Sequence, residues 1–294
     1  MKPDWLNTVC ANDLTWDVVV AKNTEGVIDA ALVFCVKKKY GITQITMPPF
    51  TQFTGFWFSE NISQSVDNQQ VIINFLLKKL PTAFRTALRF HYNFTDKNAL
   101  TQLGFTVEKR QTQELTNIQN KALTHQNLSQ SVQRNLKKAS QYFRIETKDD
   151  FDLFYKISNT VFERQNISNP IPLSIWRSIH TLIQQRGCGK VYYSVDENGE
   201  SQAVAIVVWD VKTMYLIANS ATNKGRKMDV MTHLIWHIME ENAGQVGNFS
   251  FLGSSTPSIA AFNLRFSAEN KVYFAALKYQ NVVVKKIFEF LSKA

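Results

Sequence analysis

Two parts of this chain repeat the same succession of apolar and turn-forming segments, and this repeat limits the possible folds more than any other feature. Apolar runs predict strands at residues 30–34, 42–47 and 88–92 in the first copy and at residues 203–207, 214–220 and 248–252 in the second. A helical segment follows the second of these strands in each copy, at residues 71–80 and 229–242. Phe90 to Phe105 spans fifteen positions, and so does Phe251 to Phe266. A repeat of this length predicts a duplicated domain, because the repeats of solenoid proteins are only about 20–50 residues long.

Length and composition agree with two globular domains. The chain has 294 residues, of which 45% are hydrophobic and 19% are charged. At about 150 residues per domain, this length predicts two domains, and the composition is typical of a soluble globular protein. The apolar runs at residues 30–36 and 203–209 are seven residues long, well short of the roughly 18 that span a bilayer. The N-terminus has no apolar stretch typical of a secretory signal, so the sequence predicts a cytoplasmic protein without a transmembrane segment.

Charge and cysteine content narrow the function further. The formal net charge of +9 predicts attraction to polyanions, whether a phosphorylated cofactor, RNA or a membrane surface. Cys10, Cys35 and Cys188 are far apart and form no Cys-x-x-Cys pair, which argues against a disulfide framework and against a zinc ribbon.

A basic segment at residues 129–140 connects the two copies. It predicts a helix capped by Ser129, with a buried stripe and no acidic residue. The buried stripe comprises Val132, Leu136 and Ala139, and the cations of the exposed side are Arg134, Lys137 and Lys138. Two interpretations remain open: an ordinary solvated helix face, or a surface that binds the phosphates of a bulky substrate or of a nucleic acid.

The remainder of the second copy predicts a mixed α/β sheet. A strand at residues 142–146 and helices at 149–164 and 173–185 precede two strands at 191–195 and 202–209, which an Asn-Gly turn joins as a hairpin. Alternating strands and helices of this kind are typical of a sheet that helices flank.

The loop after residues 214–220 could bind an anion. It contains Gly225 among the cations Lys224, Arg226 and Lys227, and a predicted helix begins near Asp229. Free N–H groups and the positive end of the helix dipole favour a pyrophosphate at such a junction, although a plain loop with solvated cations has the same residues. In the first copy the matching residues 47–57 include no cation and two prolines, so we expect no phosphate site there.

Taken together, these segments resemble the Fem-like, double-domain branch of the GNAT acyltransferase superfamily. The resemblance rests on the basic glycine loop at 221–228 with its helix, the stretch Phe249-Ser250-Phe251-Leu252-Gly253-Ser254, the segment 47–55 and the basic segment 131–139. It implies two tandem GNAT-like domains, each a mixed, mostly antiparallel sheet flanked by helices. The implied boundaries are 1–120 for a domain without a phosphate loop, 121–145 for a basic connecting helix and 146–294 for the acyl-donor domain.

The resemblance also implies an activity, the transfer of an acyl group from acyl-CoA, acetyl-CoA or another, to an amine that binds between the domains. The amine would belong to a small molecule or to a peptidoglycan precursor. A Fem-type aminoacyltransferase that uses charged tRNA is the first alternative, and it is the less favoured one because no long helical hairpin is evident. A catalytically inactive binding protein is the second.

Donor-binding residues follow from the same resemblance. The family's strand pairs with the pantetheine arm, a role that maps to Ala218, Asn219 and Ser220. The pyrophosphate loop maps to Lys224, Gly225, Arg226, Lys227 and Met228. This chain departs from the family in having long side chains at Arg226 or Lys227, where a second small residue is usual. Those side chains could crowd the phosphates.

Acceptor-side and catalytic residues are less constrained. Phe53 and Trp57, with Arg134 and Lys138, are candidates for binding the acceptor or its phosphates, and the aromatic pair could equally be core residues. Tyr273 is the candidate general acid toward the departing thiolate, and it could instead be a packing residue of a strand.

Other titratable residues are weaker candidates for chemistry. Asp210 and Glu163 could act as bases, although surface carboxylates are the simpler interpretation. His233 and His237 share a helix face, but no third ligand is evident nearby, so no metal is expected.

Overall fold

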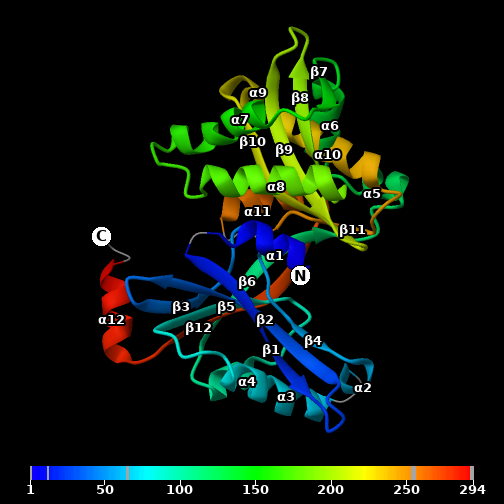
Figure 1. Ribbon diagram of the computed structural model, residues 1–294. Coiled ribbons are helices and arrows are strands. Elements are labelled where there is room, and N and C mark those ends of the chain that lie inside the picture. The colour runs from blue at the N-terminus through cyan, green and yellow to red at the C-terminus, as the bar shows by residue number, and fades with distance from the viewer. Residues whose placement is uncertain (1, 12, 64–65, 253–255, 292–294) are drawn as a thin grey trace. The chain divides into compact units, whose positions relative to one another are not determined.

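The computed structural model describes residues 2–11, 13–63, 66–252 and 256–291. The chain divides into two compact units, which Figure 1 shows in ribbon form. The first unit comprises Met1–Arg110 together with Val272–Ala294, and the second comprises Gln111–Lys271. Gly253 and Ser254 of the motif described above lie outside the described residues.

The first unit is a sheet with helices α3 (Val66–Lys78) and α4 (Lys97–Gln102) packed on one face. Its other helices are α1 (Pro3–Val9), α2 (Glu60–Ser63) and α12 (Val282–Leu291). Its strands are β1 (Leu14–Lys22), β2 (Ile28–Lys39), β3 (Ile42–Thr46), β4 (Phe56–Phe58) and β5 (Arg85–Phe90), with parts of β6 (Thr106–Leu115) and β12 (Glu269–Tyr279). The strand order is β1-β2-β3-β5-β12, and β4 pairs with β2. The core lies between the sheet and helices α3 and α4, where Leu32, Leu76, Phe90 and Leu100 are buried.

The second unit has helices on both faces of its sheet. Its helices are α5 (Lys121–Gln126), α6 (Gln130–Ala139), α7 (Phe151–Arg164), α8 (Leu173–Arg186), α9 (Asn223–Lys227), α10 (Val230–Asn242) and α11 (Pro257–Leu264). Its strands are β7 (Phe143–Thr147), β8 (Gly189–Asp196), β9 (Ser201–Trp209), β10 (Thr213–Ala221) and β11 (Asn248–Ser250). The strand order is β6-β11-β10-β9-β8-β7. Helix α10 packs on β8, β9 and β10, whereas α7 packs on β9 and β10 and α8 on β8.

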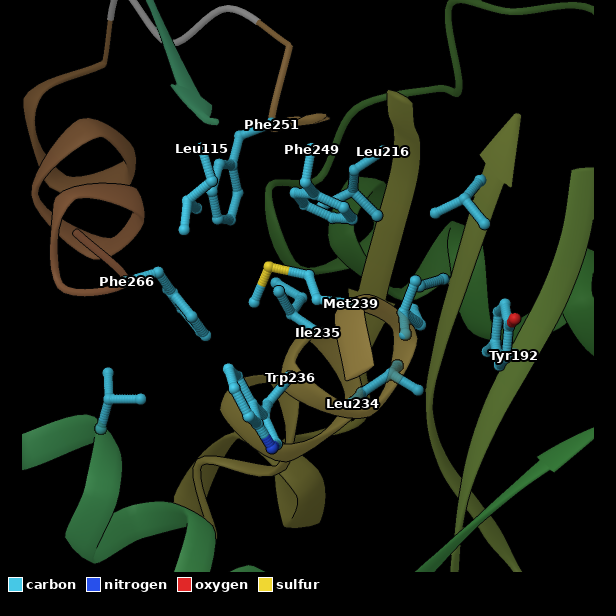
Figure 2. Packing of buried hydrophobic residues seen from close by; sticks show 14 of the residues in the cluster. Leu115, Tyr192, Leu216, Leu234, Ile235, Trp236, Met239, Phe249, Phe251 and Phe266 are labelled. Atoms are coloured by element: carbon cyan, nitrogen blue, oxygen red, sulfur yellow. The ribbon is translucent and has the colours of Figure 1, made fainter. Parts of the chain in front are cut away.

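The core of the second unit explains why its elements form where they do. Figure 2 shows Ile235 and Met239 of α10 beside Leu216 of β10 and Phe249 of β11. These side chains are buried, and burial of each such apolar side chain contributes about 1.5–3 kcal/mol. On α6 the predicted stripe of Val132, Leu136 and Ala139 is buried, and the Ser129 hydroxyl accepts the amide proton of Val132 as the predicted N-cap.

Each unit is completed by a strand from the other copy of the repeat. Strand β6, which ends the first copy, pairs with β11 through Leu115 and Phe249 in the second unit. Strand β12, which ends the second copy, pairs with β5 through residues 274–279 in the first unit. For this reason residues 272–294 group with the N-terminal residues, whereas the boundaries expected from the sequence assigned the whole of 146–294 to one domain.

The strand pairs confirm the predicted sheet type. Between named strands, the described pairs are antiparallel apart from β3 with β5 and β10 with β11, which are parallel. The two parallel pairs occupy the same place in the two copies. The predicted strands and helices of both copies are also present, and the structure adds β1, β4, β6, α12 and several short helices to them.

Candidate functional site

Strand β10 separates from β11 after the first third of its length. The two strands pair in parallel only through residues 213–215 of β10, whereas the pairing of β10 with β9 continues to Ala221. A bulge at Ile217 interrupts that second pairing, because Leu216 lies opposite Val207 and Ala218 lies opposite Ile206. From residue 216 onward, no strand of the described chain pairs with the other edge of β10. Its peptide groups are therefore available to an extended ligand that carries amides of its own.

The equivalent position in the first unit is occupied by the chain itself. There β3 and β5 pair in parallel at Ile45 and Thr86, and the chain then leaves β3 as a nine-residue insertion, 47–55, before it returns as β4. Thr54 forms a parallel bridge beside Phe90, with its amide donating to Arg89 over 2.7 Å and its carbonyl accepting from His91 over 3.0 Å. The two copies therefore differ at this point: an insertion lies along β5, whereas the matching edge of β10 has no described strand partner.

A short helix follows β10 where the sequence predicted a loop. Helix α9 begins after Thr222, whose hydroxyl accepts the amide proton of Gly225 over 3.1 Å. Gly225 is buried against β9, and a Cβ at this position would overlap the carbonyl oxygen of Gln202 and lie 2.9 Å from Val230 Cγ1. Glycine is therefore needed here for the close packing of α9 on β9, whatever the segment binds.

An ion pair fixes α9 to the turn between β8 and β9. Lys224 Nζ lies 2.6 Å from Asp196 Oδ2, and Gln202 Nε2 donates to the same oxygen over 2.9 Å. The Asp196 side chain is 3% exposed, whereas that of Lys224 is 53% exposed. The ammonium group holds the pKa of Asp196 below its usual value. Much of the charge of Lys224 is thus balanced within the protein, and the residue positions α9.

Two arginines at the end of β10 have no acidic partner within the described chain. Arg226 of α9 is exposed, and Arg164 of α7 donates from Nη1 to the Ala221 carbonyl over 3.0 Å. Partial desolvation and then the charge of Arg226 lower the pKa of Arg164. Two neighbouring guanidinium groups without a carboxylate favour a bound anion. Sequence reasoning missed Arg164, because only the packing of α7 on β10 brings the end of that helix to the loop.

The other predicted donor-binding residues surround this end of β10. Ser220 is buried and its hydroxyl lies 3.0 Å from that of Thr160 on α7. Ala218 is half-buried and Asn219 is exposed, while Lys227 is exposed and Met228 packs against the core. Helix α10 begins only after Asp229, which has a φ of 51° and whose carboxylate accepts from the Asn135 side chain on α6. Two residues, Met228 and Asp229, therefore separate α9 from α10, and Asp229 has a left-handed backbone conformation.

The predicted acceptor-side aromatics lie in the first unit. The Phe53 ring meets that of Tyr273 edge-on at 4.9 Å between centroids, and that of His91 at 5.3 Å. Tyr273 is 3% exposed, which agrees with its packing interpretation. Trp57 on β4 is 55% exposed. Arg134 and Lys138 are in the second unit, exposed on α6 as expected.

Of the remaining titratable candidates, Asp210 has hydrogen-bond partners, whereas the buried Nδ1 of His233 has none among the described residues. Asp210 accepts from the amides of Lys212 and Thr213 and from the Tyr215 hydroxyl, so it stabilises a turn. Burial, and secondly the charge of His237, lower the pKa of His233 to about 4. Among the described residues, no group of three or more His, Cys, Asp or Glu side chains is placed to hold a metal ion. No helix in the described ranges is long and apolar enough to cross a membrane.

Comparison by sequence identifies a domain in the second part of the chain. Residues 125–257 match the family model described as an acetyltransferase (GNAT) domain. A search of curated proteins found no significant match.

Comparison by structure covers nearly the whole chain. FemX matches 92% of this chain and 90% of its own, with a TM-score of 0.70 and 10% identity. A C-terminal domain from Agrobacterium fabrum, assigned to a lysylphosphatidylglycerol synthetase, matches 97% of this chain and 89% of its own, with a TM-score of 0.62 and 11% identity. A tandem GNAT protein from the clavulanic acid biosynthesis pathway matches 92% and 84% respectively, with a TM-score of 0.57 and 10% identity.

These matches confirm the resemblance and the fold class that the sequence predicted. At such low identity the structural likeness establishes the fold and leaves the substrates open. Residues 125–257 match the model of an acetyltransferase (GNAT) domain, and the chain as a whole has the fold of FemX and of a solved tandem GNAT protein.

Proposed function

We propose that this protein is an N-acyltransferase that transfers an acyl group from acyl-CoA to an amine. The observation that carries the proposal is the free edge of β10 beside Arg164 and Arg226 in the second unit. In the first unit the matching place is filled by the bridge between Thr54 and Phe90, which supports a single donor site. An open strand edge next to paired cations suits a ligand with an amide-containing arm and a diphosphate.

The donor would lie along β10 with its diphosphate at the end of the strand. Backbone groups of Ala218 and Asn219 would pair with the pantetheine amides, because this edge has no described strand partner. Arg226 and Arg164 would bind the diphosphate bidentately, with Lys227 adding charge. Lys224 would contribute mainly by positioning α9, since it is paired with Asp196 at 2.6 Å.

The chemistry requires little covalent participation by the protein. The neutral amine attacks the thioester carbonyl, a C–N bond forms, the C–S bond breaks, and the amine proton is lost as the thiolate is protonated. Holding the two reactants together can supply much of the rate acceleration. Tyr273 remains our candidate donor of the proton to the thiolate, and Phe53 and Trp57 our candidates for acceptor contacts.

A tRNA-linked donor is the alternative that one observation favours. Arg134, Lys137 and Lys138 form an exposed row on α6, and no ion pair involves them within the described chain. Such a row could follow the phosphates of a nucleic acid. FemX has a similar fold, but its sequence identity of 10% is too low to decide which donor this protein uses.

Calorimetric titration with acetyl-CoA tests the proposal. We expect Arg164→Gln with Arg226→Gln to weaken binding at least about tenfold, which corresponds to 1.4 kcal/mol. The control, Lys22→Gln with Lys109→Gln, removes the same charge from exposed positions of the first unit and should bind as the wild type does. Equal losses in the two double variants, or no binding to the wild type, would contradict acyl-CoA as donor.

The same titration with tRNA distinguishes the alternative. A tRNA donor predicts binding that falls steeply with salt and weakens in Arg134→Gln with Lys138→Gln. If only tRNA binds, and the α6 variant loses that binding, the donor is an aminoacyl-tRNA. If neither ligand binds, the result favours the inactive binding protein considered above.

A further inference from the structure

The first unit has an arginine-lined hollow on the sheet face opposite its core. On β5, Leu88 and Phe90 point into the core, so the alternating residues Arg85, Ala87 and Arg89 point to the other face. The hollow there measures about 180 Å³. Its lining comprises Thr46, Met47, Arg85, Ala87, Leu88, Arg89, Thr106, Glu108, Arg110, Ala275, Ala276 and Leu277, all of the first unit.

Two features explain the hollow: small side chains on the strands, and fewer helices on this face of the sheet than in the second unit. Ala87 of β5 lies opposite Leu277 of β12, and Arg89 lies opposite Ala275, so two alanines line the strand surface between longer side chains. In the second unit, α7 and α8 precede the sheet hairpin and pack on β8, β9 and β10. In the first unit only α1, a helix of 7 residues, precedes β1. Because the first unit has only this short helix before its sheet, part of this sheet face is uncovered.

The charges in the hollow are unbalanced. Arg110 pairs with Glu108 at 3.0 Å, so these two charges offset each other. Arg85 and Arg89 are half-buried, and neither has a carboxylate partner within the described ranges. Their Cα atoms are separated by about 13 Å, since a strand rises about 3.3 Å per residue. Both side chains are long enough to reach the space above Ala87, where they could bind one anion from two sides.

We propose that this hollow binds the phosphate group of a small phosphate ester. Guanidinium groups suit the phosphate geometry because they donate two parallel hydrogen bonds. A volume near 180 Å³ is about six times the share of one water molecule, and it is smaller than the roughly 300–1,000 Å³ of sites that enclose whole ligands. The hollow therefore has room for a phosphorylated head group. This site is separate from the donor site proposed above and does not depend on it.

Calorimetric titration with glycerol 3-phosphate tests the site on the intact protein. We expect saturable binding to the wild type and a dissociation constant raised at least tenfold in Arg85→Gln with Arg89→Gln. The matched control is again Lys22→Gln with Lys109→Gln, because Lys109 is exposed on the opposite face of β6. Unchanged affinity in the arginine variant, or an equal loss in the control, would overturn the proposal.

A second variant keeps the charges and fills the space. Ala87→Leu should abolish binding, because the added side chain occupies the floor of the hollow between the two arginines. Far-UV circular dichroism and the melting temperature establish that each variant is folded. If folded Ala87→Leu binds glycerol 3-phosphate as the wild type does, the ligand does not sit in the hollow and the inference is wrong.

Vesicles identify the source of the phosphate. Flotation with phosphatidylglycerol vesicles, compared with phosphatidylcholine vesicles, tests a lipid head group. If phosphatidylglycerol binding is lost in the Arg85 and Arg89 variant and kept in the lysine control, the ligand is a lipid. If the soluble ester binds in the same arginine-dependent way and the vesicles do not, the ligand is a soluble phosphate ester. If neither binds through these arginines, the proposal fails.

Discussion

At the scale of single residues, charge compensation decides which cations are available to a ligand. Lys224, Arg226 and Lys227 look equivalent in the sequence, yet Lys224 is paired with the buried Asp196. Arg226 instead has Arg164 as its charged neighbour. A cation beside another cation gains more from a bound diphosphate than a cation that is already neutralised. The availability of each cation thus depends on its partner.

A partly buried histidine predicts how the stability of the second unit depends on pH. The pKa of His233 is about 4 in the folded protein, below its usual value of 6.5, mainly because the ring is partly buried. The unfolded chain therefore binds a proton first as the pH falls. The contribution to the free energy of unfolding is complete above pH 6.5 and is lost progressively as the pH drops toward 4.

Urea denaturation at pH 7.5 and pH 5 measures this effect. We expect His233→Gln to lose less stability between the two pH values than the wild type, because the group that titrates is absent. His125→Gln, which removes an exposed histidine, should keep the pH dependence of the wild type. If His233→Gln and the wild type respond identically to pH, burial of this ring does not control the effect.

At the scale of elements, α9 is held by close packing, a cap and an ion pair. Thr222 caps its first turn, Gly225 allows it to approach β9, and Lys224 joins it to Asp196. Each of these contacts leads to the β8–β9 hairpin or to the start of α9. The position of Arg226 relative to β10 therefore depends on the hairpin as much as on its own helix.

Gly225→Ala tests this packing. The new methyl group meets the Gln202 carbonyl and Val230, so overpacking should lower the free energy of unfolding by about 1–3 kcal/mol. Gly244→Ala is the matched control, because nothing lies within 4 Å of a Cβ at that glycine. Chemical denaturation of both variants gives the comparison. An unaltered Gly225→Ala protein would show that α9 does not pack tightly on β9.

Local sequence patterns predicted most helices and strands. The features that they did not predict depend on contacts between residues far apart in the sequence. The apolar run at 203–207 and the Asn-Gly turn correctly predicted the β8–β9 hairpin. A short turn of this kind requires the two strands that flank it to pair with each other. The bridge of Thr54 beside Phe90 was not predictable, since hydrogen bonding between distant backbones has no signature in side-chain order. The same reason hid the proximity of Arg164 and Arg226. Helix α9 and its cap at Thr222 were also missed, because the sequence was interpreted as a loop there.

At the scale of the whole molecule, two strands carry the chain across the boundary between the copies. Strand β6 begins in the first unit and pairs with β11 in the second, and β12 returns from the second unit to pair with β5. A ladder of backbone hydrogen bonds does not depend on which copy supplies the strand.

The exchanged strands predict that the two units unfold together. Leu88→Ala on β5 removes a fully buried side chain from the first unit and should cost about 2–5 kcal/mol. Because β12 pairs with β5 and continues from the second unit, we expect a single calorimetric transition that moves as a whole to lower temperature. Met239→Ala in the second core should act likewise. Two transitions, of which Leu88→Ala moves only one, would contradict the coupling.

The central claim is that only the second copy of the repeat holds an acyl-CoA. Hydrogen–deuterium exchange of the intact protein with and without acetyl-CoA tests it most directly, because amides that pair with a ligand exchange more slowly. The account predicts protection at residues 216–228, on the free edge of β10 and in α9, with none at residues 42–63. Protection at residues 42–63 without protection at 216–228, or no protection in either stretch at a saturating concentration, would contradict it.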